Sequence, residues 1–181
     1  MNLSKLRLLL LFPLLLSLPG CSSNSQKRAE ALFGEGRKIG IQQTKVMNEW
    51  AREFGQIFTE QNRAQFPANR DWLNSRVQKI LPLMDESLRL GNEATEKLVE
   101  SSRLMSREQD RKGVALIAES FRKSIEIEQL LKQQALLPSD ATITDAKVFN
   151  EKFAHIDELV RQKQKEQDDQ FDEGKRLMLT K

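Results

Sequence analysis

The feature that most constrains the fold of this chain is a regular apolar seam between residues 73 and 105. Ten positions recur there at steps of three and four residues: Leu73, Val77, Ile80, Met84, Leu88, Gly91, Thr95, Leu98, Ser102 and Met105. Steps of this size place all of these side chains on one face of an α-helix, whereas a strand repeats every two residues. The spacing therefore predicts a helix from about Asp71 to Met105 that must bury this face against other helices.

Three further segments show the same periodicity, and no run of alternating β-branched residues predicts a strand. They cover about Lys27 to Ala64, Ser106 to Ala135, and Thr142 or Thr144 onward. Their seams are Val46, Met47, Trp50, Phe54, Ile57 and Phe58 in the first, Val114, Ile117, Phe121, Ile125 and Leu131 in the second, and Phe149, Phe153, Ile156 and Val160 in the third. Extending the first seam toward the N-terminus reaches Gly36, Gly40 and Gln43. This predicts either fraying before Gly40 or a neighbouring helix packed closely on the glycines.

Breaks in the periodicity mark the helix connections. Pro67 ends the periodic pattern of the first segment. Ser106 to Gln109 has the sequence of a capping box, with Ser106 as N-cap, and Pro138 lies in a loop over 136–141. No apolar residue lies between Met105 and Val114, which favours a break there, although one continuous helix remains the alternative. We therefore expect an all-α fold over residues 27–181: an elongated antiparallel bundle of about four helices, each roughly 45–55 Å long.

Residues 1–20 are typical of a secretory signal peptide rather than of the bundle. Lys5 and Arg7 form a basic start, and an apolar run from Leu8 to Leu18 follows. The run is too short to cross a membrane, because a spanning helix needs about 20 apolar residues.

The end of this segment, Leu18-Pro19-Gly20-Cys21, resembles the lipobox of bacterial lipoproteins. The resemblance implies cleavage between Gly20 and Cys21, a diacylglyceryl group on the Cys21 thiol, and acylation of the new amine with a fatty acid such as palmitate. Residues 21–26 would then be a polar tether. Ser22, which is not Asp, resembles the pattern that sorts lipoproteins to the outer membrane, facing the periplasm. An ordinary signal peptide followed by a free cysteine is the alternative.

Composition excludes several classes of function. The chain has 29 Lys and Arg against 26 Asp and Glu, and loss of Lys5 and Arg7 with the signal peptide leaves a nearly neutral domain, which argues against nucleic-acid binding. One Cys and one His exclude a disulfide framework and multi-Cys or multi-His metal sites. Since no catalytic or nucleotide-binding motif is present, we expect no catalytic residue, no metal site and no cofactor.

One group of residues is a candidate partner site. Trp50, Phe54, Phe58, Phe66 and Trp72 cluster near the turn between the first two helices. They form either part of the core or an exposed aromatic patch at the membrane-distal tip. The leading expectation is a membrane-anchored, non-enzymatic envelope lipoprotein that contacts membrane lipid through Cys21 and acts by binding an envelope protein.

The alternative function is a ligand- or haem-binding helical bundle in the periplasm. His155 would be an axial ligand, with Met47, Met84 or Met105 as the second. A histidine at the surface or at its boundary is the competing interpretation. The acidic residues Asp168, Asp169, Asp172 and Glu173 lack the spacing of a calcium loop and are more typical of a solvated helix face.

Overall fold

The structure, a computed structural model, describes residues 24–179, and this part of the chain is helical without strands. Four long helices dominate: α1 (Asn24–Ile57), α3 (Arg70–Leu104), α4 (Glu108–Leu136) and α5 (Ala146–Leu179). A short helix α2 (Glu60–Ala64) lies between α1 and α3, and a 3₁₀ turn η2 (Leu137–Ser139) follows α4. The predicted all-α bundle of about four long helices is confirmed.

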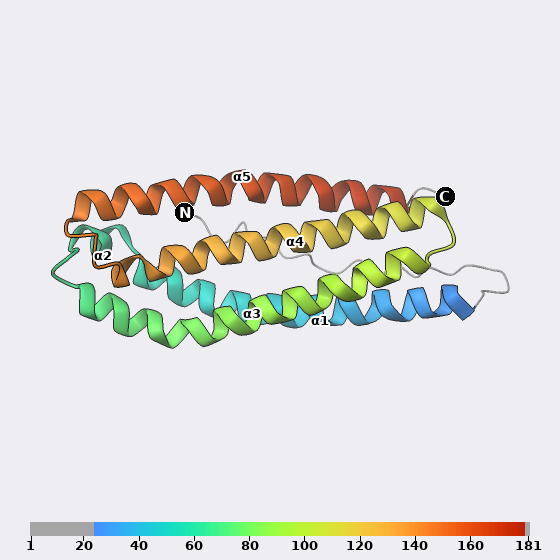
Figure 1. The fold of residues 1–181 in the computed structure, drawn as a ribbon, viewed down its shortest axis with the longest axis horizontal. Coiled ribbons are helices and arrows are strands. Elements are labelled where there is room, and N and C mark those ends of the chain that lie inside the picture. The colour runs from blue at the N-terminus through green and yellow to red at the C-terminus, as the bar shows by residue number, and fades with distance from the viewer. Residues whose placement is uncertain (1–23, 180–181) are drawn as a thin grey trace.

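The long helices alternate in direction, so the molecule is an elongated rod with two distinct ends (Figure 1). The end that holds the start of α1, the α3–α4 connection and the end of α5 is here named the proximal end. The distal end holds α2 and the α4–α5 connection. α1 packs along α3, α3 along α4, and α4 along α5. With 34 residues in α1, the two ends are separated by about 50 Å.

The predicted seams are the buried faces of the helices. Val77 and Val114, for example, are fully buried, and only Val46, Leu88 and Ile156 among the seam residues are partly exposed. The core consists of two apolar clusters. The distal cluster is built around residues such as Trp50, Leu73 and Phe149, and the proximal cluster around Leu98, Val114 and Met178.

Glycines permit close helix contacts at two places. A Cβ atom added to Gly40 would lie 2.6 Å from the Phe121 ring, and one added to Gly174 would lie 2.8 Å from the carbonyl oxygen of Gly113. Such separations are shorter than van der Waals contact, so the Phe121 ring of α4 packs directly on the backbone of α1 at Gly40, and the backbones of α4 and α5 meet at Gly113 and Gly174. Since α1 is helical from Asn24, the expectation of fraying before Gly40 is wrong and that of close packing is confirmed.

The first helix ends seven residues earlier than predicted, at Ile57 rather than Ala64. Asn62 explains the break, because its side-chain amide donates hydrogen bonds to the carbonyl oxygens of Gln56 (3.2 Å) and Ile57 (3.0 Å). These are among the last carbonyls of α1, which lack partners within the helix. Thr59 then accepts a hydrogen bond from the Asn62 backbone N–H at 3.2 Å and starts α2.

The predicted capping box at Ser106 is wrong, although the predicted break is present. α3 ends at Leu104 and α4 begins at Glu108, with Arg107 at the N-cap position and no side-chain cap. The Ser106 hydroxyl and backbone N–H instead both donate to Oε1 of Gln26, at 2.9 Å and 3.1 Å. Ser106 therefore makes its hydrogen bonds with Gln26 of α1 and not with the first turn of α4.

The last helix starts at Ala146, slightly later than the expected Thr142 or Thr144. Asp145 is its capping residue, since its carboxylate accepts a hydrogen bond from the Val148 backbone N–H at 2.9 Å. A charged acceptor suits the positive end of the helix dipole.

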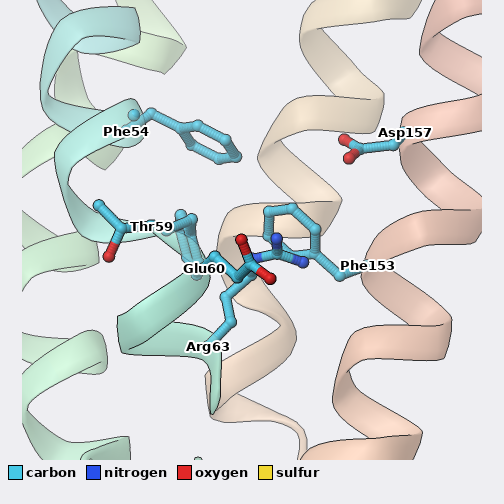
Figure 2. Close-up of a pocket in the computed structure, with 8 residues that line it drawn as sticks. Phe54, Thr59, Glu60, Arg63, Phe153 and Asp157 are labelled. Atoms are coloured by element: carbon cyan, nitrogen blue, oxygen red, sulfur yellow. The ribbon is translucent and has the colours of Figure 1, made fainter. Parts of the chain in front are cut away.

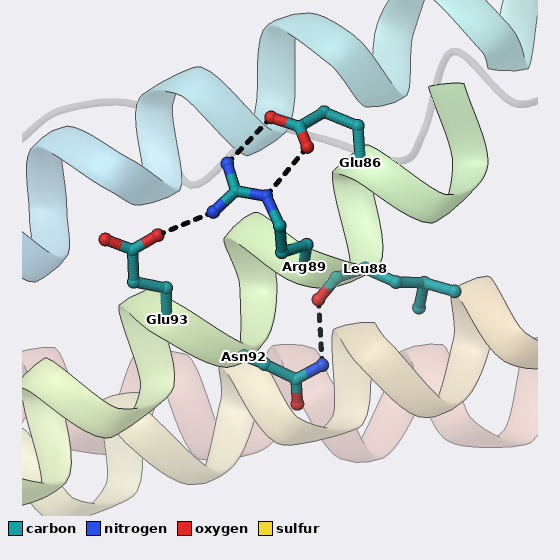
Figure 3. Close-up of polar contacts among 5 residues, drawn as sticks. All are labelled: Glu86, Leu88, Arg89, Asn92 and Glu93. Carbon is teal, nitrogen blue, oxygen red and sulfur yellow. Dashed lines mark hydrogen bonds and ion pairs between the residues drawn. The ribbon is translucent and has the colours of Figure 1, made fainter. Parts of the chain in front are cut away.

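Charged pairs cover the outside of the rod. On α3, Arg89 bridges Glu86 and Glu93, while the Asn92 amide donates to the Leu88 carbonyl oxygen (Figure 3). Between α4 and α5, Lys163 pairs with Glu126 and Lys123 with Glu166. The polar stretch 161–170 of α5 thus lies along α4. Each exposed pair contributes only about 0.2–1 kcal/mol, so these pairs add little to the stability supplied by the core.

Candidate functional site

The predicted cleavage and lipidation positions, Gly20 and Cys21, lie outside the described residues and stay predictions. What the structure places is the start of α1 at Asn24, three residues after Cys21, at the proximal end. Over residues 24–179, no helix combines the length and the apolar composition that a membrane span requires.

The five aromatic residues of the candidate partner site do not form one exposed patch. Trp50, Phe54, Phe58 and Phe66 are buried, with at most 6% of their surface exposed, whereas Trp72 is 46% exposed. The structure thus favours core packing for four of the five. The predicted role in partner binding stays a prediction, and Trp72 alone of the five presents a largely accessible side chain.

Two phenylalanines from α5 complete the aromatic core at the distal end. Phe153 packs against Phe58 with ring centroids 5.3 Å apart, and Phe149 stacks on Phe66 at 4.4 Å. Phe58 in turn lies 4.8 Å from Phe54. These contacts join α1, the α1–α3 connection and α5, so the distal end is held together largely by rings.

A pocket of about 250 Å³ opens beside this aromatic cluster, between the end of α1, α2 and α5 (Figure 2). This pocket is here named the distal pocket. The residues that line it are Phe54, Gly55, Phe58, Thr59, Glu60, Arg63, Phe153 and Asp157. The Phe54 and Phe153 rings face one another across it, and charged side chains from α2 and α5 lie beside them (Figure 2). Sequence reasoning identified Phe54 and Phe58 but missed Glu60 and Arg63, because the α2 segment was expected to continue the first helix.

The charged groups of the distal pocket differ in how they are held. The Arg63 guanidinium lies 4.5 Å from the centre of the Phe153 ring and donates a hydrogen bond to Asn150 at 3.1 Å. Asp157 accepts a hydrogen bond from the buried Gln134 amide at 2.8 Å. Glu60 is exposed and makes no hydrogen bond or ion pair with the described residues. The pocket thus combines two fixed charges with one that has no partner.

A second polar feature lies inside the rod, where the two apolar clusters meet. Glu128 is 2% exposed and accepts a hydrogen bond from the Gln43 amide at 2.6 Å. Burial raises the pKa of the Glu128 carboxyl to about 7, while Ser87 and Gln43 beside it oppose the shift. No role for Glu128 was predicted from the sequence. Its spacing of three residues from both Ile125 and Leu131, two seam residues, was the available signal.

The residues of the alternative function are not brought together. His155 is exposed on α5, and within residues 24–179 no group of three or more His, Cys, Asp or Glu side chains could hold a metal ion. In the acidic cluster, Asp168, Asp169 and Asp172 are exposed, and Glu173 pairs with Arg176 at 2.6 Å.

Comparison with known proteins adds no relative: no family model, curated protein or solved structure matches this chain.

Proposed function

We propose that this protein is a non-enzymatic bacterial lipoprotein, anchored through an acylated Cys21 in the outer membrane and facing the periplasm, which binds another envelope protein at its distal end. The observation that carries the proposal is the match of residues 18–21 to a lipobox directly before a helical rod that starts at Asn24. Two acyl chains hold a protein firmly on a bilayer, whereas one chain holds it only marginally.

The arrangement of the helices supports a contact function away from the membrane. Three residues reach at most about 11 Å, so an acylated Cys21 keeps the start of α1 near the bilayer. α1 then carries the chain about 50 Å outward to the distal end (Figure 1). A rod with this orientation presents its far end to other proteins of the envelope.

Exposed apolar side chains gather at that end. In the described part of the chain the large exposed hydrophobic residues are Trp72, Leu136, Val148 and Leu179. The first three lie at the start of α3, the end of α4 and the start of α5, all of which are at the distal end. Exposed apolar groups near charged ones are common in protein–protein contact surfaces.

The alternative, a bundle that binds haem or another ligand among its glycines, receives less support. Neighbouring atoms fill the positions beside Gly36, Gly40 and Gly91. His155, the only histidine, is exposed. We therefore favour protein contact as the function.

The anchor is tested by expressing the full chain and its Cys21→Ser variant in a Gram-negative bacterium. We expect the wild-type chain in the outer-membrane fraction, shortened by its signal peptide and heavier by its acyl groups in intact-mass spectra. The variant should carry no lipid and should leave that fraction. A wild-type chain without lipid contradicts the proposal.

The contact function is tested in the same cells by placing a photo-crosslinking amino acid at position 72 and, as a matched control on the same helix, at the exposed position 103. We expect a crosslink to one envelope protein from position 72, at the distal end of α3, and none from position 103. Equal labelling from both positions, or none, contradicts a distal contact.

A further inference from the structure

We propose that the distal pocket receives a lysine side chain of the partner protein. This inference rests on the proposed contact function and names the chemistry of one part of that contact. It is drawn from the size, the walls and the charges of the pocket.

The size of the pocket matches one side chain. Sites for drug-sized ligands are about 300–1,000 Å³ and are mostly enclosed by the protein. The distal pocket, at about 250 Å³, is smaller and lies beside α2 (Figure 2). A single long side chain projecting from a partner surface fits this volume.

The walls of the pocket are partly apolar and partly charged. The Phe54, Phe58 and Phe153 rings line the pocket, and Glu60 and Asp157 reach it from α2 and α5 (Figure 2). A lysine side chain has the same combination of apolar and charged parts, since a stem of four carbons carries a charged ammonium group at its end. Its stem would lie against the rings while its ammonium group meets the carboxylates.

The charges of the pocket favour a cation. Glu60 has no partner within the described residues, so its carboxylate is available to an incoming ammonium group. Asp157 is held in place by Gln134 at 2.8 Å. Against these two carboxylates the pocket has one cationic group, Arg63, which donates a hydrogen bond to Asn150 and lies over the Phe153 ring, while its buried Nε has no hydrogen-bond partner.

The position of Arg63 also favours lysine over arginine. An arginine gains much of its advantage by stacking its flat guanidinium on an aromatic face. At the distal pocket Arg63 already covers a face of Phe153, with 4.5 Å between the guanidinium carbon and the ring centre. A compact ammonium group needs no such face and can pair with a carboxylate of the pocket.

The test is a titration of the full chain, purified from membranes in detergent, with the blocked amino acid Nα-acetyl-lysine methylamide. Binding is followed through the NMR signals of ¹³C-labelled phenylalanine rings. We expect weak, saturable shifts of pocket-ring signals. The corresponding norleucine and glutamate derivatives test the contribution of charge, and we expect both to bind at least several-fold more weakly.

Two variants test the assigned carboxylates. Glu60→Gln and Asp157→Asn should each weaken binding of the lysine derivative by about two- to fivefold, as expected for one partly exposed charge. Glu151→Gln is the matched control, because Glu151 is exposed on α5 and does not line the pocket. It should leave binding unchanged. Since Glu60 is exposed, its variant should fold normally, which circular dichroism verifies.

The outcomes separate this inference from the proposed function. Tighter binding of the glutamate derivative would mean that Arg63 selects an anion, and equal binding of the norleucine derivative would mean that charge is irrelevant. Either result, or no binding of lysine, overturns the inference. A partner crosslinked from position 72 would in each case leave the contact function standing. Conversely, lysine binding without a crosslinked partner would support the pocket and contradict the contact function.

Discussion

The Gln43 amide on α1 donates a hydrogen bond of 2.6 Å to the Glu128 carboxylate on α4, 85 residues away in sequence. The two side chains are 4% and 2% exposed. Sliding one helix past the other by a turn would leave both groups buried without this partner, and each buried unsatisfied group costs about 1–3 kcal/mol. The pair therefore fixes the lengthwise alignment of helices whose apolar seams alone permit several alignments.

The first prediction concerns the pH dependence of stability. The pKa of Glu128 is about 7 in the folded protein, against 4.5 for a free glutamate. Since the folded state holds the proton more tightly, its contribution to stability is complete below pH 4.5, falls as the pH rises through 7, and is lost above that range. The free energy of unfolding should change by about 3 kcal/mol in total over this pH range. Urea unfolding between pH 5 and pH 9 measures it.

Glu128→Gln should remove this dependence, because the neutral amide keeps an acceptor for Gln43 and cannot ionise. We expect the variant to be more stable than the wild type at pH 9 and similar to it at pH 5. Glu126→Gln is the control on the same helix. Its carboxylate pairs with Lys163, which lowers the pKa of Glu126, so that variant should gain no stability at pH 9. An unchanged pH profile in Glu128→Gln contradicts the assignment.

The second prediction concerns the close contact of α4 and α5. A methyl group added at Gly174 would lie 2.8 Å from the backbone oxygen of Gly113, which cannot turn aside. We expect Gly174→Ala to lower the free energy of unfolding by about 1–3 kcal/mol. Gly34→Ala is the matched control, because a methyl group there meets nothing within 4 Å. It should raise stability by up to about 1 kcal/mol, as alanine favours helix. Thermal unfolding followed by circular dichroism compares the two.

The third prediction concerns the proximal end. Gln26 is 3% exposed and accepts hydrogen bonds from both the backbone N–H and the hydroxyl of Ser106. Gln26→Ala should leave these donors without that partner and destabilise the α3–α4 connection by about 1–3 kcal/mol. Hydrogen exchange should accelerate at Ser106 and its neighbours. Lys27→Ala, at the adjacent exposed position, is the control. If exchange at Ser106 is as slow in Gln26→Ala as in Lys27→Ala, Gln26 does not hold the α3–α4 connection.

The fourth prediction separates the two tryptophans. Trp50 is fully buried and Trp72 is 46% exposed. Trp50→Ala should cost about 3–5 kcal/mol, the range for removing a large aromatic residue from a core. Trp72→Ala should change the free energy of unfolding by less than about 1 kcal/mol. In the wild type, acrylamide should quench the fluorescence of Trp72 readily and that of Trp50 only slightly. A large loss of stability in Trp72→Ala contradicts its surface position.

The helices and their buried faces could be predicted from sequence because apolar spacing is a local signal. Leu73 to Met105 shows it most clearly, and the predicted limits of this helix, Asp71 and Met105, differ from the observed ones by one residue each. Connections depend on partners that are distant in sequence. Ser106 had a suitable local arrangement for capping, but Gln26, which is 80 residues away in sequence, accepts hydrogen bonds from its hydroxyl and backbone N–H instead.

Only part of the distal pocket could be predicted from the sequence. Phe54 and Phe58 follow the seam spacing, whereas Glu60 and Arg63 reach the pocket because the chain breaks at Thr59. Asn62 makes that break possible by binding two carbonyl groups of α1, an interaction that has no periodic signature. Glu128 was missed for a similar reason, since its partner Gln43 lies on another helix.

One uninterrupted helix, α1, begins three residues after Cys21 and ends beside the distal pocket. A pull between a membrane held at one end and a partner held at the other would therefore act along the axis of a single helix. The other helices would share such a load through their contacts with α1, most of which are made by α3. Tension would stretch α1 and shear it against α3 before it separated α4 from α5. Lengthwise sliding of α1 would then be the movement that such a load favours, and the Gln43–Glu128 pair resists this sliding relative to α4.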